Sequence, residues 1–192
     1  MKKNENGQVI IIVAVLLVVV LTILAVIIDG ARLMVEQQEI NRAADAAGKA
    51  GLIVVGDRMV TQVVAAQTAA ASITLTATPI GSTLGPTLTP TPAADDIFSW
   101  ISDNDRKTLV APPMQTLVAT HVMSSAEENG FGSSNPVING LQISFPDQYH
   151  LEDEYIQIGV RIDRKVVIMF GKLLNIEEGV LSGNTKQNIP QR

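Results

Sequence analysis

The sequence has no cysteine, few aromatic residues and no cluster of basic residues. Without cysteine there is no disulfide framework, no thiolate zinc site and no cysteine nucleophile. The 14 Lys and Arg residues are outnumbered by 19 Asp and Glu residues, which gives a formal net charge of -5. A nucleic-acid-binding protein needs a basic face that displaces counterions from phosphates, so the composition argues against that function class.

Motifs for catalysis and for metal binding are also lacking. The sequence contains no phosphate-binding glycine loop, nucleophile elbow or zincin motif. The two histidines, His121 and His150, have no ligand-like spacing to each other or to a carboxylate cluster. Residues 103–105 (Asp-Asn-Asp) resemble the start of an EF-hand loop, but Thr108 stands where that loop needs glycine. We therefore expect no catalytic residue, cofactor, metal or small-molecule substrate.

The longest apolar run, Val9–Ile28, carries no charged side chain and no proline or glycine. As a helix it would rise about 30 Å, which matches the hydrocarbon core of a bilayer. A cleaved signal peptide is the main alternative. Its apolar core would be shorter and would end at a small-x-small site, whereas this run ends at Ile-Ile-Asp. We interpret residues 9–28 as a single transmembrane helix.

The basic residues that flank the run bear on its orientation. Lys2 and Lys3 precede the run, and Arg32 and Arg42 follow it, so their numbers are nearly balanced. A short N-terminal tail ahead of a first apolar helix usually stays in the cytoplasm. We therefore expect residues 1–8 to form a cytoplasmic tail and the C-terminal domain to lie outside the cytoplasm.

Good helix formers without proline follow the run and predict a helical stalk over residues 29–73. Ala43, Ala47 and Gly51 fall four apart, which would let another helix approach closely. We expect this face to pack against a helix, and we consider a partner subunit as the source of that helix. An apolar stripe follows, which the chain's own distal domain or a partner helix must cover: Leu52, Val55, Met59, Val63 and Ala66. Of the two, we favour the chain's own domain.

The remaining chain predicts a linker and a small α+β domain. Residues 74–95 are rich in Thr, Pro, Ser and Gly, which indicates an extended linker or exposed loop. Residues 96–185 predict short helices followed by an antiparallel sheet, and residues 186–192 a flexible tail. One helix opens at Pro113. Its predicted buried face has four members: Leu117, Val118, His121 and Val122.

Alternating apolar and polar residues predict the strands of this sheet. One strand includes residues 141–145, and the clearest covers residues 156–162. We expect Asp163-Arg164-Lys165 to turn the chain into a further strand over residues 166–170. A weaker final strand is predicted near residues 179–182. The fold class is therefore α+β, with an N-terminal transmembrane helix that continues into a long Ala-rich helix.

Small and charged residues recur in a fixed order around the apolar run. A Gly-Gln pair precedes it, a charged segment (Asp-Gly-Ala-Arg, residues 29–32) follows it, and an Ala-rich run with one Asp lies further on. The positions are Gly7, Gln8, Asp29, Gly30, Arg32, Ala43, Ala44, Asp45, Ala46 and Ala47. In this pattern, strongest over roughly the first fifty residues, the chain resembles the TadE/TadG-like proteins of Flp-type (tight adherence) pilus assembly. The resemblance implies a pilin-like distal domain and a place in a prokaryotic cell membrane.

The resemblance also implies a role and partners. It implies a pilus-assembly protein that is not an enzyme and that contacts the lipid bilayer and other envelope subunits, including further copies of itself. Asp29 and Arg32 then mark the membrane boundary or contact another membrane subunit, and Asp45 is a solvated charge or pairs with a basic group. Processed pilins of this group carry a Glu five residues after the cleaved Gly, where this chain has Ile12. We therefore expect an uncleaved signal anchor in an accessory or assembly subunit.

Two other functions stay open. A stand-alone membrane-anchored binding or adhesion module would use the Thr/Pro-rich tract as a spacer, and its gene would lack a neighbouring secretion ATPase. A processed pilin or pseudopilin subunit of a filament would lose residues 1–7. Mass spectrometry of the mature N-terminus would detect that loss.

Overall fold

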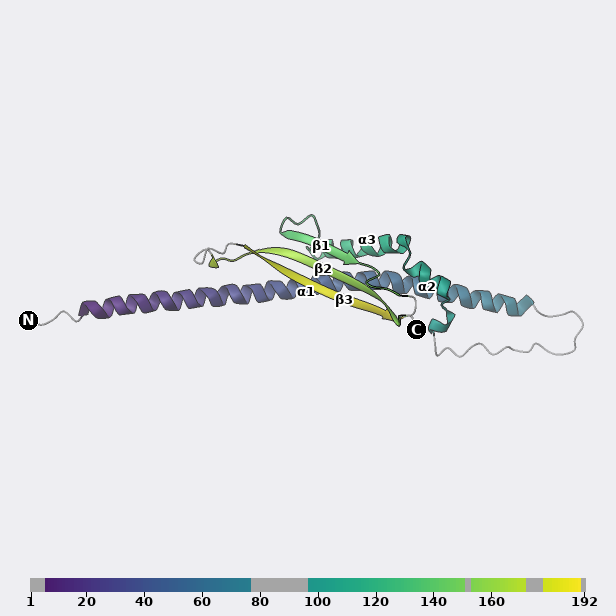
Figure 1. Ribbon diagram of the computed structural model, residues 1–192, viewed down its shortest axis with the longest axis horizontal. Helices are drawn as coiled ribbons and strands as arrows, with labels where there is room; N and C mark the ends of the chain where they lie inside the picture. Colours follow the sequence, from purple (N-terminus) through teal and green to yellow (C-terminus); the bar gives the residue numbers. More distant parts are fainter. Residues whose placement is uncertain (1–5, 77–96, 151–152, 172–177, 191–192) are drawn as a thin grey trace, which may run out of the picture.

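The structure is a computed structural model that describes residues 6–76, 97–150, 153–171 and 178–190. One helix, α1 (Asn6–Thr76), runs the length of the molecule, and the other elements pack along its middle (Figure 1). The molecule is thus a long helical rod with an α+β body on one side. The predicted linker over residues 74–95 lies almost entirely outside the described residues, as do most of residues 1–8.

Short helices and one sheet form the body. The described helices are η1 (Ile97–Trp100, a 3-10 helix), α2 (Asp103–Leu109) and α3 (Pro112–Glu128). The sheet is antiparallel in the order β1-β2-β3, with strands β1 (Ile138–Ser144), β2 (Tyr155–Val167) and β3 (Glu178–Pro190). This arrangement confirms the predicted α+β fold.

Local sequence explains where α2 and α3 begin. The Ser102 hydroxyl accepts a hydrogen bond from the backbone N–H of Asp105 at 3.2 Å, and the Asp105 carboxylate accepts one from the N–H of Ser102 at 3.2 Å. This reciprocal capping box satisfies two donors that the first turn leaves without helical partners. Residues 103–105 therefore start a helix and do not form a calcium loop. Pro112, one residue earlier than predicted, opens α3.

The buried face of α3 differs from the predicted one. Leu117 and His121 are exposed, although Val118 and Val122 are buried as predicted. The buried stripe repeats every four residues: Met114, Val118, Val122 and Ala126. The prediction was wrong for Leu117 and His121 because α3 packs against α1 through the face that carries Met114, Val118 and Val122. The sequence of α3 alone does not reveal which of its faces is covered.

Strand β2 forms the centre of the sheet, and alternate residues of it face the helices. Ile156, Ile158 and Ile162 are completely buried, as alternation of apolar and polar residues requires when one face is covered. Pairing with β3 continues without a break along the whole strand, from the pair Tyr155 and Pro190 to the pair Val167 and Glu178.

The predicted turn at residues 163–165 is therefore wrong. Each of these residues pairs with one in β3, so β2 runs on to Val167. Strand β3 is also longer than the predicted segment over residues 179–182. It includes residues 186–190, so the predicted flexible tail over residues 186–192 is wrong for this part, because residues 186–190 pair with the first half of β2.

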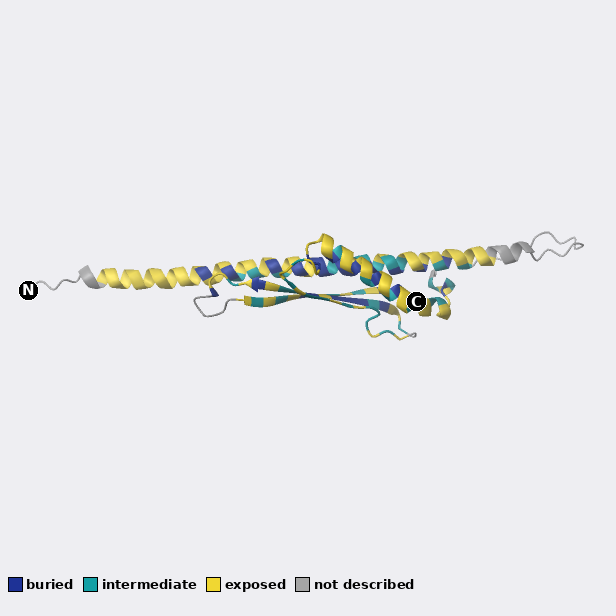
Figure 2. Cartoon of the chain, turned by 90° about the horizontal axis from the view of Figure 1, so that it is seen from above, coloured by how far each residue is buried: buried dark blue, intermediate teal, exposed yellow. Residues whose placement is uncertain are grey.

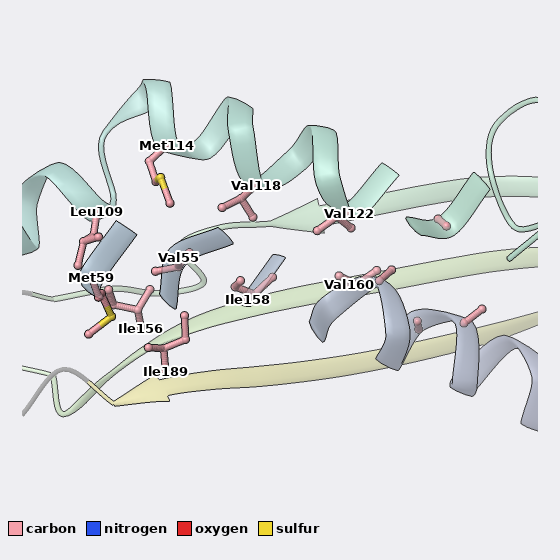
Figure 3. Packing of buried hydrophobic residues seen from close by; sticks show 14 of the residues in the cluster. Val55, Met59, Leu109, Met114, Val118, Val122, Ile156, Ile158, Val160 and Ile189 are labelled. Carbon is pink, nitrogen blue, oxygen red and sulfur yellow. The ribbon is translucent and has the colours of Figure 1, made fainter. Parts of the chain in front are cut away.

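The hydrophobic core lies between α1, α3 and the inner face of the sheet (Figure 3). Val55, Met59 and Val63 are buried in it, so the chain's own body covers this stripe, as favoured from the sequence. Figure 3 shows Leu109 at the end of α2 beside Met59. Buried residues of α1 gather in its middle, whereas the described side chains on either side of this region are mostly exposed (Figure 2).

The first part of α1 extends beyond the body. Within Val9–Ile28 every described side chain is exposed except that of Ala25 (Figure 2). Such a continuous apolar surface is unfavourable in water and favourable in lipid. Among the described residues, α1 is the one helix long and apolar enough to cross a membrane. The structure therefore fits a single-pass membrane protein.

Candidate functional site

The small-residue face predicted to admit a second helix meets the chain's own body. Ala43 and Ala47 are buried, and a Cβ placed at Gly51 would lie 2.9 Å from Val122 and 3.2 Å from Ile158. A helix does approach closely here, but it is α3 of the same chain. A larger side chain at these positions would disturb this core before it reached a partner.

The Asp in the Ala-rich run connects α1 to β3. Asp45 accepts a hydrogen bond from the side-chain amide of Gln187, and its other carboxylate oxygen lies 2.6 Å from Nζ of Lys49. A Cβ at Gly48 would lie 3.0 Å from Gln187 and 3.1 Å from Thr185. The absence of a side chain at Gly48 thus lets β3 come close enough for the amide of Gln187 to reach Asp45. The contacts of Asp45 are thus with Lys49 on the same helix and with Gln187 on β3, and the second links helix and strand.

The two residues predicted at the membrane boundary have different partners. The buried carboxylate of Asp29 accepts a hydrogen bond from the backbone N–H of Phe170 at 2.8 Å. Arg32 is half exposed and donates through Nε to Glu36 at 2.8 Å, one helical turn away. Asp29 therefore does more than end the apolar run, because it holds the turn that follows strand β2. Sequence reasoning missed Phe170 since 141 residues separate it from Asp29.

The outer face of the sheet is polar, and Asp163 lies near its middle. One oxygen of Asp163 accepts hydrogen bonds from the Ser182 hydroxyl at 2.5 Å and from Nε of Arg161 at 3.0 Å. The Ser182 bond, and after it Arg161, hold the pKa of Asp163 below its ordinary value of 3.8, although partial burial acts in the opposite direction. A lowered pKa means that folding favours the ionised carboxylate.

This linkage predicts how acid affects the sheet. The stabilisation from Asp163 should be complete above pH 3.8 and should be lost as the pH falls through the lower pKa of the folded state. We expect Asp163→Asn to lower stability at neutral pH and to have little effect in strongly acidic solution. Denaturant unfolding across this pH range measures the difference. Asp57→Asn on the exposed side of α1 is the control, and an equal pH profile for both variants would contradict the linkage.

The same outer face has a hollow of about 260 Å³ over Gly159. Two of its charges are already paired, because Nζ of Lys186 lies 2.8 Å from Asp147. The described residues contain no group of three or more His, Asp or Glu side chains that could hold a metal ion. His121 is exposed on α3, whereas His150 lies in a loop, where its Nδ1 is 3.6 Å from Oδ2 of Asp153. The structure therefore does not bring the two histidines together.

An apolar stripe on the outward side of α1 remains uncovered. Ile53, Val60 and Val64 are 64%, 61% and 54% exposed, and they lie outside the apolar run that fits a membrane. Their spacing of seven and four residues places them on one helical face. Sequence reasoning missed this stripe because it followed the neighbouring apolar residues that the core buries. The seven-residue spacing was the available signal.

Residues 7–74 match a protein-family model described as "Putative Flp pilus-assembly TadE/G-like". The match includes the apolar run, the charged segment at residues 29–32 and the Ala-rich run, so it confirms the resemblance inferred from the sequence. No curated protein and no solved structure matches the chain.

Proposed function

We propose that this chain is a pilin-like accessory or assembly subunit of a Flp-type pilus or related secretion system. Support comes from the match of residues 7–74 to the TadE/G-like family model and from the helix that is long and apolar enough to cross a membrane. The subunit acts by protein-protein contacts and not as an enzyme. Its N-terminus lies in the cytoplasm, and its α+β body lies on the opposite side of the membrane. The observation that carries this proposal is the uncovered stripe of Ile53, Val60 and Val64.

The stripe suits a partner that is itself a long membrane-anchored helix. Ile53 follows Ile28 by 25 residues, which places it about 37 Å along the helix axis from the end of the span. Helix α1 is continuous over this distance. A sibling subunit with a similar helix, or a second copy of this chain, can therefore lie alongside α1 from the membrane to the stripe.

The energy available from the stripe is sufficient to matter. Complete burial of a Val or Ile side chain contributes about 1.5–3 kcal/mol relative to exposure. Apolar side chains on one face of a helix also set the register of a partner helix. The face on the other side of α1, with Ala43, Ala47 and Gly51, already packs on the chain's own body. We therefore assign partner contact to the outward stripe.

A charge in the stripe tests this assignment. Val60→Asp is expected to reduce co-purification with sibling pilus-assembly subunits or with a tagged second copy at least tenfold, because a carboxylate would be buried in an apolar contact. The full-length protein is extracted from membranes in mild detergent, and the co-purified chains are quantified by mass spectrometry. Membrane attachment and the fold should be unchanged, since Val60 is exposed.

Leu117→Asp is the matched control, because Leu117 is 46% exposed on α3 and lies away from the stripe. It should retain the partners of the unmodified protein. Equal recovery of partners with Val60→Asp and with the unmodified protein would refute the role of the stripe.

A further inference from the structure

We propose that the segment that ends β2 and follows it, residues 167–171, is a second membrane contact, which enters the headgroup region of the bilayer beside α1. This tip is defined by Val167, Ile168, Met169, Phe170 and Gly171. The proposal rests on the membrane span of α1, but it does not depend on the orientation of the chain or on its protein partners. It assigns to the body a direct interaction with lipid.

The tip lies at the same level as the end of the apolar run. In Figure 1 the hairpin extends back along α1 to the part of the helix that carries the end of this run. The hydrogen bond from the N–H of Phe170 to Asp29, at 2.8 Å, fixes the tip against the first charged residue after the span. The position of the tip along the membrane normal is therefore tied to that of the span.

The contacts of the tip continue into the span itself. An apolar hollow of about 220 Å³ lies between the two elements, lined by Val26, Asp29, Gly30, Leu33, Ile168, Phe170 and Gly171. Val26 precedes Asp29 by three residues, which is about 4.5 Å further into the membrane along the helix axis. Ala25, on the same helical face as Asp29, is the one buried residue within Val9–Ile28. This side of the span is therefore covered at the level where hydrocarbon begins.

The exposed side chains of the tip have the chemistry of an interfacial anchor. Met169 is 59% exposed, Val167 55% and Phe170 37%, although Val166, beside them at the end of β2, is buried. The free energy of apolar side chains of this kind falls when they move from water into the boundary between headgroups and acyl chains. Lys165 is exposed on the same strand, and Arg32 is half exposed on α1. Both are near enough in sequence to the boundary residues to meet anionic headgroups.

Lipid is the occupant that the geometry favours over a protein. A partner that covered Met169 would have to displace lipid at the edge of the bilayer, since the tip adjoins the span. The bilayer is present at this level without any further assembly. The tip thus meets lipid whenever the span is inserted.

The absence of cysteine allows a direct test, because each introduced cysteine is then the one site for a thiol-reactive fluorophore. The full-length protein with Met169→Cys is labelled with the environment-sensitive dye NBD and reconstituted in vesicles of phosphatidylcholine and phosphatidylglycerol. Ile23→Cys provides a position inside the span. Met123→Cys provides a control on α3, where the native side chain is 48% exposed.

The expected result is a blue-shifted emission at position 169 relative to position 123, together with strong quenching by phospholipids brominated near the headgroup. Adding Asp29→Ala should reduce the quenching at position 169 and leave that at position 23 unchanged. Unaltered quenching in the Asp29→Ala variant would overturn the role given to the hydrogen bond with Phe170.

Two outcomes would overturn the lipid contact itself. One is quenching at position 169 no greater than at position 123, with position 23 still quenched. The other is a blue shift at position 169 without quenching, which would mean that protein covers the tip. If position 23 were not quenched either, the membrane span would fail along with this inference, so the two failures are distinguishable.

Discussion

Truncation of Leu109 to alanine is expected to lower the free energy of unfolding by about 2–5 kcal/mol. Leu109 is completely buried at the end of α2, and it lies beside Met59 of α1 in Figure 3. The substitution removes buried methyl groups and leaves a cavity that the neighbouring helices can fill only in part. Because Leu109 is the one buried residue of α2, the attachment of α2 to α1 should weaken first.

The matched control makes the same chemical change on the surface. Leu117→Ala removes a side chain that is 46% exposed, so it should change stability by less than about 1 kcal/mol. The emission of Trp100, the one tryptophan of the chain, reports unfolding of the body, because this residue packs against the core. Denaturant titration of the full-length protein in detergent provides the comparison. Equal midpoints for the two variants would show that the core does not include Leu109 as described.

A second large effect is expected where β3 crosses α1. A Cβ added at Gly183 would collide with the side chain of Ile40 and would also lie 2.9 Å from its backbone carbonyl carbon. A flexible side chain can move away from such a contact, but a helix backbone cannot do so without displacing the strand. We expect Gly183→Ala to destabilise the body by about 1–3 kcal/mol.

The control for this effect lies on the same strand. A Cβ at Gly179 would meet its nearest neighbour, Val166, at 3.6 Å, which is an ordinary contact. Gly179→Ala should therefore be neutral or stabilising by up to about 1 kcal/mol, since alanine restricts the unfolded chain. Denaturant unfolding gives the stability of both variants, and hydrogen exchange of β3 amides locates the change. Faster exchange in Gly179→Ala than in Gly183→Ala would contradict this account.

Parts of the fold were predictable because a single local pattern determines them. The run Val9–Ile28 is apolar on all sides, which only lipid or a deep core accommodates. Residues 156–162 alternate because one face of β2 is buried and the other is not. The stripe with Val55 and Met59 indicated correctly that the distal body covers α1. In each case the signal comes from residues that are close together in the sequence.

Other features depend on residues far apart in the chain, and the local pattern was then misleading. Asp163-Arg164-Lys165 has the composition of a turn, but pairing with β3 keeps these residues extended. The contact between Asp29 and Phe170 has no local signature at all. Gly51 correctly indicated close approach of a helix, yet the sequence does not specify whether that helix belongs to the same chain. The identity of the neighbour is a tertiary property.

Helix α1 has no break between the span and Thr76. Its 47 residues beyond Asp29 rise about 70 Å, so the helix acts as a lever with its short arm in the bilayer. Transmembrane helices are commonly inclined by about 20°, which would carry the far end of such a lever about 24 Å sideways. A change in bilayer thickness at one end thus becomes a change in lateral reach at the other.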